Sequence, residues 1–186
     1  MSDAGKHIEL GQYQNSEFSR GRGKFVELMW LICSAVFVES FVPGNFHRLM
    51  FLRLFGAKIG RGTVIKPAVK VKFPWRLTIG VDSWIGEGVW IDNLDHVSIS
   101  DNCCLSQDVY LCTGSHDWSD VTFSLRTAPI VLKHGVWLGA KSVVCPGVVV
   151  ETGVVLTVSS VLSVKTDAWT IYQGNPAVAL KRRELL

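Results

Sequence analysis

The 186-residue chain lacks several patterns that identify common functional classes. Its five cysteines show no paired metal-ligand spacing, which favours reduced structural thiols in a cytoplasmic setting over a zinc site or disulfides. No basic stripe interleaves with aromatic residues, so we expect no binding to nucleic acid. An apolar stretch over residues 25–42 contains Glu27 and Glu39, which argues against a transmembrane span, and we expect no signal peptide.

Aliphatic residues, by contrast, recur at a fixed period. Isoleucine, leucine or valine stands at every sixth position in five groups of three: Ile59, Ile65 and Val71; Ile79, Ile85 and Ile91; Ile99, Leu105 and Leu111; Leu132, Leu138 and Val144; Val150, Leu156 and Leu162. A repeat at a short fixed period overrides local helix or strand preferences. The period predicts a mainly β fold, a left-handed parallel β-helix of about five triangular coils with one hexad on each face.

A second row of side chains supports this register. Two residues before each aliphatic, the side chain should also point inward because strand side chains alternate. These positions hold small or β-branched residues, as a narrow interior requires: Ser83, Val89, Val97, Cys103, Val109, Ile130, Val136, Ser142, Val148, Val154 and Ser160. The alternative is a β-sandwich, but its strands would not keep one six-residue phase over the whole segment.

Breaks in the period divide the chain into segments. Two short insertions predict corner bulges, and residues 114–129 leave the coil as an excursion loop. A long excursion from a compact repeat usually carries function. We therefore expect the β-helix over 59–166, a polar tail and helical cap over 1–58, and a C-terminal turn with a short basic helix over 167–186.

The segments on either side of the coil carry basic residues. Two apolar helices, at 25–42 and 46–55, either cap the open end of the solenoid or rest on the anionic inner face of the cytoplasmic membrane, and both interpretations can hold together. After the coil, a Gly-Asn-Pro-Ala turn at 174–177 precedes the stretch 178–186, which includes Lys181. This last stretch is the predicted C-terminal helix.

His116 stands out among the five histidines. It lies where the coil gives way to the excursion loop, within Thr-Gly-Ser-His-Asp-Trp at 113–118. A histidine on a loop held by a rigid scaffold suits general-base catalysis, although a lone loop histidine is more often inert. The others lie outside the repeat or at its bulges and corners, and we assign them no catalytic role: His7, His47, His96 and His134.

Three motifs carry a family resemblance. Trp-Leu-Gly at 137–139, Cys-Pro-Gly-Val at 145–148 and the Gly-Asn-Pro-Ala turn resemble the signature of hexapeptide-repeat acetyltransferases, which include the maltose, galactoside and nodulation-factor O-acetyltransferases. Leu-Cys-Thr-Gly-Ser-His-Asp at 111–117, with Phe-Pro-Trp at 73–75 and Ile-Gly-Glu-Gly-Val at 85–89, is similar to the colanic-acid-type acetyltransferases of bacterial exopolysaccharide synthesis.

The resemblance, which covers residues 46–183, implies a homotrimer with three active sites between neighbouring subunits. Acetyl-CoA would be the co-substrate, without a metal. His116 aligns with the catalytic histidine, which takes the proton from a sugar hydroxyl as its oxygen attacks the thioester. The backbone N–H of Ala140 aligns with the donor to the oxyanion. Asp117 either orients the imidazole or caps the loop.

The resemblance also implies contacts to coenzyme A. Trp137 aligns with a tryptophan beside the coenzyme A arm, although packing at the trimer interface would equally explain it, and Gly139 and Ala140 lie next to it in the sequence. Val158 and Ser163 align with positions that meet the pantetheine. Lys181 aligns with a basic residue near the phosphates, and Lys141 and Lys165 are weaker candidates.

The acceptor site departs from the family pattern. The maltose and galactoside acetyltransferases carry an acceptor-binding asparagine upstream of the histidine, and the aligned position here, around 86–88, holds glycine. Asp92 and Asn93 lie close in the sequence and are the candidate replacements. The acceptor would be a saccharide, free, nucleotide-linked or lipid-linked, of an exopolysaccharide or lipopolysaccharide pathway.

The sequence is also compatible with other functions. The same cleft and base would serve N-acetylation of an amino sugar nucleotide, whereas serine O-acetyltransferases carry a larger N-terminal helical domain. The γ-type carbonic anhydrases share the coil but hold zinc with three histidines, and the histidines here are far apart in sequence. A non-catalytic trimeric scaffold is the remaining alternative.

Overall fold

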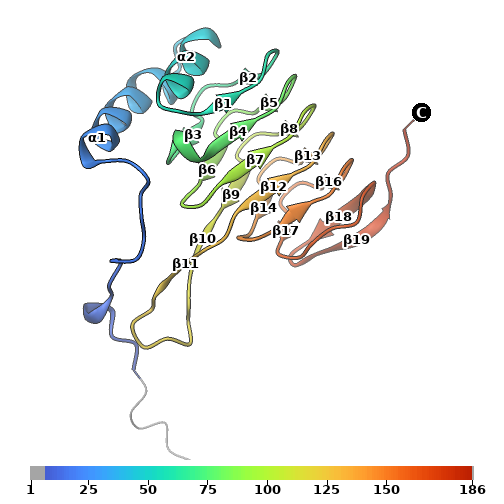
Figure 1. Ribbon diagram of the computed structural model, residues 1–186. Coiled ribbons are helices and arrows are strands. Elements are labelled where there is room, and N and C mark those ends of the chain that lie inside the picture. The colour runs from blue at the N-terminus through green and yellow to red at the C-terminus, as the bar shows by residue number, and fades with distance from the viewer. Residues whose placement is uncertain (1–6, 186) are drawn as a thin grey trace, which may run out of the picture.

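The computed structural model describes residues 7–185, which form a three-sided parallel β-helix with two helices at one end (Figure 1). The predicted left-handed coil is confirmed, because each predicted hexad forms one short strand and three successive strands make one turn. Strands of successive turns pair in parallel with the aliphatic residues in register, as Ile79 does with Ile99. Five complete turns form, and β18 begins a sixth level.

Three sheets form the sides of the prism. Sheet 1 contains β1 (Lys58–Ile59), β4 (Leu77–Ile79), β7 (Val97–Ile99), β12 (Ile130–Leu132) and β15 (Val149–Val150). Sheet 2 contains β2 (Val64–Ile65), β5 (Trp84–Ile85), β8 (Cys104–Leu105), β13 (Trp137–Leu138), β16 (Val155–Leu156), β18 (Thr170–Gly174) and β19 (Ala177–Arg182). Sheet 3 contains β3 (Lys70–Val71), β6 (Trp90–Asp92), β9 (Tyr110–Cys112), β14 (Val143–Val144) and β17 (Val161–Leu162).

The two predicted inward rows form the core. Every periodic aliphatic is buried except Ile59, which is half-buried in the first coil beneath the helices. The smaller row is buried as well, from Ser83 to Ser160. Corners between strands need a left-handed backbone conformation, and residues that tolerate it stand there, among them Asp82, Asn102 and Asp108, with φ between 52° and 57°. The interior of the prism is therefore filled by side chains and offers no binding site.

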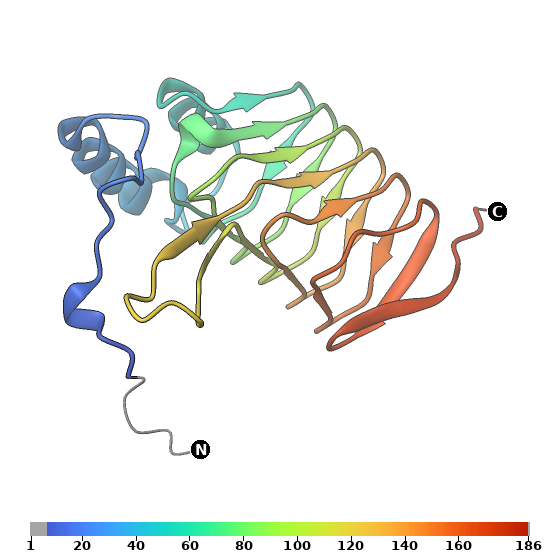
Figure 2. The ribbon, with the colours of Figure 1, turned by 60° about the horizontal axis from the view of Figure 1, so that its bottom comes forward.

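The helices cover the open end of the first coil (Figure 2). Helix α1 (Lys24–Cys33) runs into a π-helical turn (Ser34–Val38), and α2 (Phe46–Leu54) follows. Trp30 inserts its indole against the coil and donates a 3.0 Å hydrogen bond from Nε1 to the Val71 carbonyl, and Leu52 is fully buried. The segments expected to cap the solenoid do pack on it. No helix among residues 7–185 is long and apolar enough to cross a membrane.

The C-terminal segment differs from its prediction. Instead of a basic helix over 178–186, the chain forms β19, which pairs antiparallel with β18 after the Gly-Asn-Pro turn. The reason is the last parallel strand: β18 would otherwise leave one edge of unpaired backbone groups, and a returning strand satisfies them. Residue 186 lies outside the described residues, as does the beginning of the polar tail, 1–6.

Candidate active site

The excursion from the coil is an ordered hairpin that projects from the prism (Figure 1). Strand β10 (Gly114–His116) pairs antiparallel with β11 (Leu125–Thr127), and His116 stands opposite Leu125. Aspartates hold the connecting turn: Asp117 accepts a hydrogen bond from the Ser119 N–H, and Asp120 accepts one from the Thr122 N–H, each at 3.0 Å. The hairpin gives His116 a fixed position.

The imidazole of His116 is oriented by the backbone. Its Nδ1 lies 2.7 Å from the Phe123 carbonyl oxygen. A carbonyl only accepts hydrogen bonds, so Nδ1 carries the proton and Nε2 is left as the basic nitrogen. The ring also stacks on Phe123, with centroids 4.4 Å apart and planes 7° apart, and the Tyr13 ring lies 5.7 Å away. This is the tautomer that a base acting through Nε2 requires.

Asp117 has other partners than the imidazole. Its Oδ1 accepts hydrogen bonds from Ser119, and its Oδ2 lies 2.5 Å from the guanidinium of Arg126 on strand β11. The Ser119 hydroxyl and then Arg126 hold the pKa of this carboxyl down at about 2. Of the two roles considered for Asp117, its contacts match the loop cap, and the Phe123 carbonyl holds the imidazole instead. A hydrogen bond to a backbone carbonyl cannot be predicted from residue identities.

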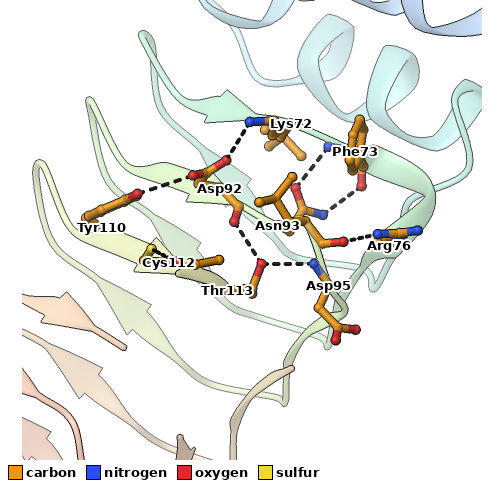
Figure 3. Close-up of polar contacts among 12 residues, drawn as sticks. Lys72, Phe73, Arg76, Asp92, Asn93, Asp95, Tyr110, Cys112 and Thr113 are labelled. Atoms are coloured by element: carbon orange, nitrogen blue, oxygen red, sulfur yellow. Dashed lines mark hydrogen bonds and ion pairs between the residues drawn. The ribbon is translucent and has the colours of Figure 1, made fainter. Parts of the chain in front are cut away.

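The two acceptor candidates, Asp92 and Asn93, lie at a corner beside the hairpin (Figure 3). Asn93 is fully buried, and its side-chain amide bonds both backbone groups of Phe73, at 2.9 Å and 2.7 Å. The Asp92 carbonyl accepts a 2.9 Å hydrogen bond from the Thr113 hydroxyl, which joins this corner to the start of the hairpin. With no exposed surface and its amide on the backbone of the neighbouring coil, Asn93 has the contacts of a structural residue rather than of an acceptor-binding one.

The Asp92 carboxylate lies on the outer face of sheet 3 with a different set of partners (Figure 3). Lys72 Nζ is 3.2 Å from Oδ1, and the Tyr110 hydroxyl donates to Oδ2 at 3.2 Å. Burial raises the pKa of Tyr110, with Cys112 and Asp92 adding to the effect, so the phenol stays a donor. Asp92 is thus a largely buried carboxylate, with a side chain that is 14% exposed, and its charge is paired with Lys72.

Most of the predicted cofactor residues do come together. Trp137, Gly139, Ala140 and Val158 line one groove of about 460 Å³ on the outer face of sheet 2. The indole of Trp137 is half-exposed and donates a 3.0 Å hydrogen bond from Nε1 to the Ser106 hydroxyl, which fixes the ring as one wall. An apolar groove with few polar groups is the usual form of a small-molecule site.

Backbone geometry explains the glycine in the Trp-Leu-Gly motif. A Cβ on Gly139 would meet the Val158 backbone nitrogen at 2.7 Å, so only glycine lets these two coils stack here. Ala140 follows, and its carbonyl accepts from the Ser159 N–H at 2.9 Å. Among the described residues, the Ala140 N–H donates to no acceptor. An oxyanion donor must be unengaged in this way.

The remaining two cofactor candidates lie apart from each other. Lys181, on β19, is the register partner of Ile171, and Ile171 lines both the Trp137 groove and a second cavity of about 360 Å³ that includes Lys181 and Arg182. The basic end of sheet 2 therefore continues the groove. Ser163 follows β17 in sheet 3 and lines neither cavity.

The sequence analysis did not identify a further cavity on the outer face of sheet 2, at the end away from Lys181. A cavity of about 430 Å³ includes Trp84 and Lys66, and it shares Ser106 and Gln107 with the Trp137 groove. Trp84 directly precedes a periodic aliphatic, as Trp137 does, and such positions point outward. A tryptophan at such an outward-facing position was the sequence signal that could have identified this cavity.

His116 does not line the Trp137 groove within one chain. The groove is on sheet 2, whereas the hairpin leaves the prism after β9 of sheet 3. Among residues 7–185, no group of three or more His, Cys, Asp or Glu side chains is placed to hold a metal ion.

Comparison with known proteins gives a close relative. The chain is 37% identical over 166 residues to the Escherichia coli protein named WcaF, described as a colanic acid biosynthesis acetyltransferase, covering 89% of this chain and 91% of WcaF. The chain belongs to the hexapeptide-repeat acetyltransferases. No model of a protein family matches it.

Solved structures show the same fold for this acetyltransferase. A hexapeptide-repeat acetyltransferase of Vibrio cholerae, complexed with acetyl coenzyme A, superimposes with a TM-score of 0.79 at 19% identity over 87% of this chain and 88% of the other. A galactoside acetyltransferase in complex with coenzyme A gives a TM-score of 0.76 at 19% identity over 86% and 82%. The resemblance stated from the motifs is confirmed.

Proposed function

We propose that this acetyltransferase transfers an acetyl group from acetyl-CoA to a hydroxyl group of a saccharide, with His116 as general base, in the synthesis of a bacterial exopolysaccharide or lipopolysaccharide. The observation that carries the proposal is the orientation of the imidazole: the Phe123 carbonyl engages Nδ1 and leaves the basic Nε2 for a substrate hydroxyl. The 37% identity of the chain to WcaF supports a role in bacterial polysaccharide synthesis.

The reaction is a direct transfer. Nε2 of His116 takes the hydroxyl proton as the oxygen attacks the thioester carbonyl carbon; the C–S bond then breaks, and the imidazolium returns the proton to the departing thiolate. The Ala140 N–H is the proposed donor to the oxyanion. No cysteine nucleophile is required, and burial raises the pKa of the Cys104 and Cys145 thiols, which keeps both protonated.

Acetyl-CoA would lie along the outer face of sheet 2. The apolar groove at Trp137 and Val158 suits the pantetheine arm, and the adjoining cavity at Lys181 and Arg182 suits the phosphates. This leaves Ser163, outside both cavities, as the weakest of the proposed cofactor residues.

The proposed enzyme is a homotrimer, because one chain does not complete the site. The Trp137 groove and the His116 hairpin belong to different sides of the prism. A neighbouring copy that brings its hairpin to the groove would place Nε2 beside the thioester. Each of three sites would then use residues of two subunits.

The surface of the helical cap bears on the location of the enzyme and on its acceptor. Exposed apolar residues crowd the helical cap, among them Phe25, Leu28, Leu31 and Ile32 on α1, next to Arg22 and Lys24. Such a surface suits peripheral contact with an anionic membrane. We propose a cytoplasmic enzyme that acts on a nucleotide-linked or lipid-linked saccharide, the latter at the inner face of the membrane.

The deciding experiment is acetyl-CoA turnover, followed by thiol release, with a panel of methyl glycosides, nucleotide sugars and amino sugars for wild type and His116→Ala. We expect turnover that depends on a hydroxyl acceptor and falls by about 10²-fold or more in His116→Ala, with acetyl-CoA binding intact. Acetylation of amines alone would point to the N-acetyltransferase alternative. If the wild-type protein does not bind acetyl-CoA, the proposed transfer is wrong and the non-catalytic scaffold is the alternative that is supported.

A further inference from the structure

An N-terminal arm, residues 9–20, lies along the His116 hairpin in both views of the molecule (Figures 1 and 2). Its first part contains a 3-10 turn, η1 (Leu10–Gln12). The Glu9 N–H donates a 2.8 Å hydrogen bond to the Val121 carbonyl in the hairpin turn, and the Tyr13 ring lies 5.7 Å from the His116 ring. The arm therefore reaches the imidazole itself.

The second part of the arm is anchored to the prism. Phe18 stacks on Phe73 with ring centroids 6.5 Å apart, and the Arg76 guanidinium lies over the Phe18 ring and bonds the Ser19 carbonyl. Trp75 donates a 2.8 Å hydrogen bond from Nε1 to the Arg20 carbonyl. The middle of the arm is thereby held between the hairpin and the prism.

A polar cavity of about 400 Å³ lies between this middle part and the hairpin. The arm contributes Gln14, Asn15, Glu17 and Phe18, and the hairpin contributes Ser124 and Thr127. Leu125, which also lines it, is the register partner of His116, and paired residues of an antiparallel ribbon point to the same side. The cavity and the imidazole are thus on one face of the hairpin.

We propose that this cavity is the acceptor site and that the arm is its specificity-determining wall, taking a neutral, hydroxyl-rich sugar ring whose reacting hydroxyl faces His116. The inference rests on the proposed transfer to a saccharide and adds where the sugar lies. It moves the acceptor contacts from Asp92, which is paired with Lys72, and Asn93, which is fully buried, to Gln14, Asn15 and Glu17.

The lining fits a sugar ring rather than a phosphate or a nucleotide. Amide groups of Gln14 and Asn15 both donate and accept hydrogen bonds, and the Glu17 carboxylate accepts from hydroxyl groups. Of the lysines and arginines within residues 7–185, none lines the cavity, so an anionic group would meet the Glu17 carboxylate without a compensating cation from that part of the chain. A volume of about 400 Å³ is within the range of small-molecule sites, about 300–1,000 Å³.

The test measures steady-state kinetics of Gln14→Ala and Asn15→Ala with the methyl glycoside that gives the highest turnover. Each variant removes hydrogen bonds to the sugar, so we expect the acceptor KM to rise about fivefold to tenfold. The KM for acetyl-CoA should change by less than about twofold. The matched control is Gln12→Ala on the same arm, since Gln12 bonds Glu9 and lies outside this cavity.

A second measurement separates this inference from the proposed reaction. Saturation-transfer NMR with the same glycosides on His116→Asn reports binding without turnover. Binding that is lost in the Gln14→Ala/Asn15→Ala background supports the cavity even if no glycoside is acetylated. Turnover with an unchanged acceptor KM in both arm variants, or no glycoside binding at all, overturns the inference.

Discussion

Trp84 and Trp137 stand on either side of Cys104 on the outer face of sheet 2, each its register partner in a neighbouring coil. Both indoles are half-exposed or more, at 62% and 47%. Only Trp137 lines the groove that leads to Lys181, whereas Trp84 lines the cavity at the other end. The two residues offer a matched pair for locating the coenzyme.

We predict that Trp137→Ala raises the dissociation constant for coenzyme A by about tenfold or more, because it removes one wall of the groove. Trp84→Ala should change it by less than about twofold, since the proposed coenzyme path runs from Ser106 toward Lys181. Titration calorimetry measures both constants. Equal losses in the two variants would place the coenzyme along the whole face instead.

Asp117 gives a prediction on pH and catalysis. Hydrogen bonds from Ser119 and Arg126 lower its pKa to about 2, below the ordinary 3.8. Because the folded-state pKa is depressed, the stabilisation of the hairpin turn is fully present above about pH 4 and is lost as the pH falls through about 2. An NMR titration of the Asp117 carboxyl carbon should give that midpoint, and Arg126→Gln should raise it.

The same contacts predict a small effect of Asp117 on turnover. Since the Phe123 carbonyl holds the imidazole, Asp117→Asn should leave kcat within about threefold of wild type at neutral pH. A loss of about 10²-fold or more, with the hairpin intact by NMR, would restore Asp117 as the orienting residue.

Arg48 is the residue at which we expect a substitution to reduce the stability of the helical cap most. Its side chain is 1% exposed, and its guanidinium donates to four carbonyls, those of Val38, Ser40, Val42 and Gly44. Arg48→Met would leave the buried Val38 carbonyl and three partly buried carbonyls without this donor, and we expect a loss of about 3 kcal/mol in the free energy of unfolding of the cap. Urea denaturation followed by Trp30 fluorescence measures it.

The control for Arg48 is Arg53→Met on the same helix. Arg53 also bonds carbonyls, those of Ile59 and Gly60, but it does so at the surface, where water can replace it. We expect a loss under about 1 kcal/mol. A cap equally stable in both variants would contradict the role given to Arg48.

The exposed face of α1 predicts membrane binding. Leu28→Ser/Leu31→Ser should abolish co-sedimentation with vesicles that contain phosphatidylglycerol, because it removes apolar side chains that would enter the interface. The matched control is Val178→Ser/Leu180→Ser on β19, which removes equally exposed apolar groups far along the chain. Unchanged binding in the Leu28 and Leu31 variant would exclude α1 as the membrane contact.

The coil could be predicted because its determinants are local and periodic. Leu105 and Leu138 lie 33 residues apart and still pair across adjacent coils, since each keeps the inward phase of its own hexad. The C-terminal stretch could not, because Val178 and Leu180 alternate on a strand whose existence depends on the unpaired edge of β18. Basic composition alone favoured a helix there.

The sequence by itself determined the coil, its register and the motif residues that share the groove, because a six-residue period fixes which side chains face the interior and which lie on the outer faces. Only the tertiary structure decided the surroundings of His116. The Phe123 carbonyl and the Tyr13 ring from the arm come from segments whose approach follows no repeat. Their contacts exist only once the hairpin and the arm have packed, and no local pattern encodes them.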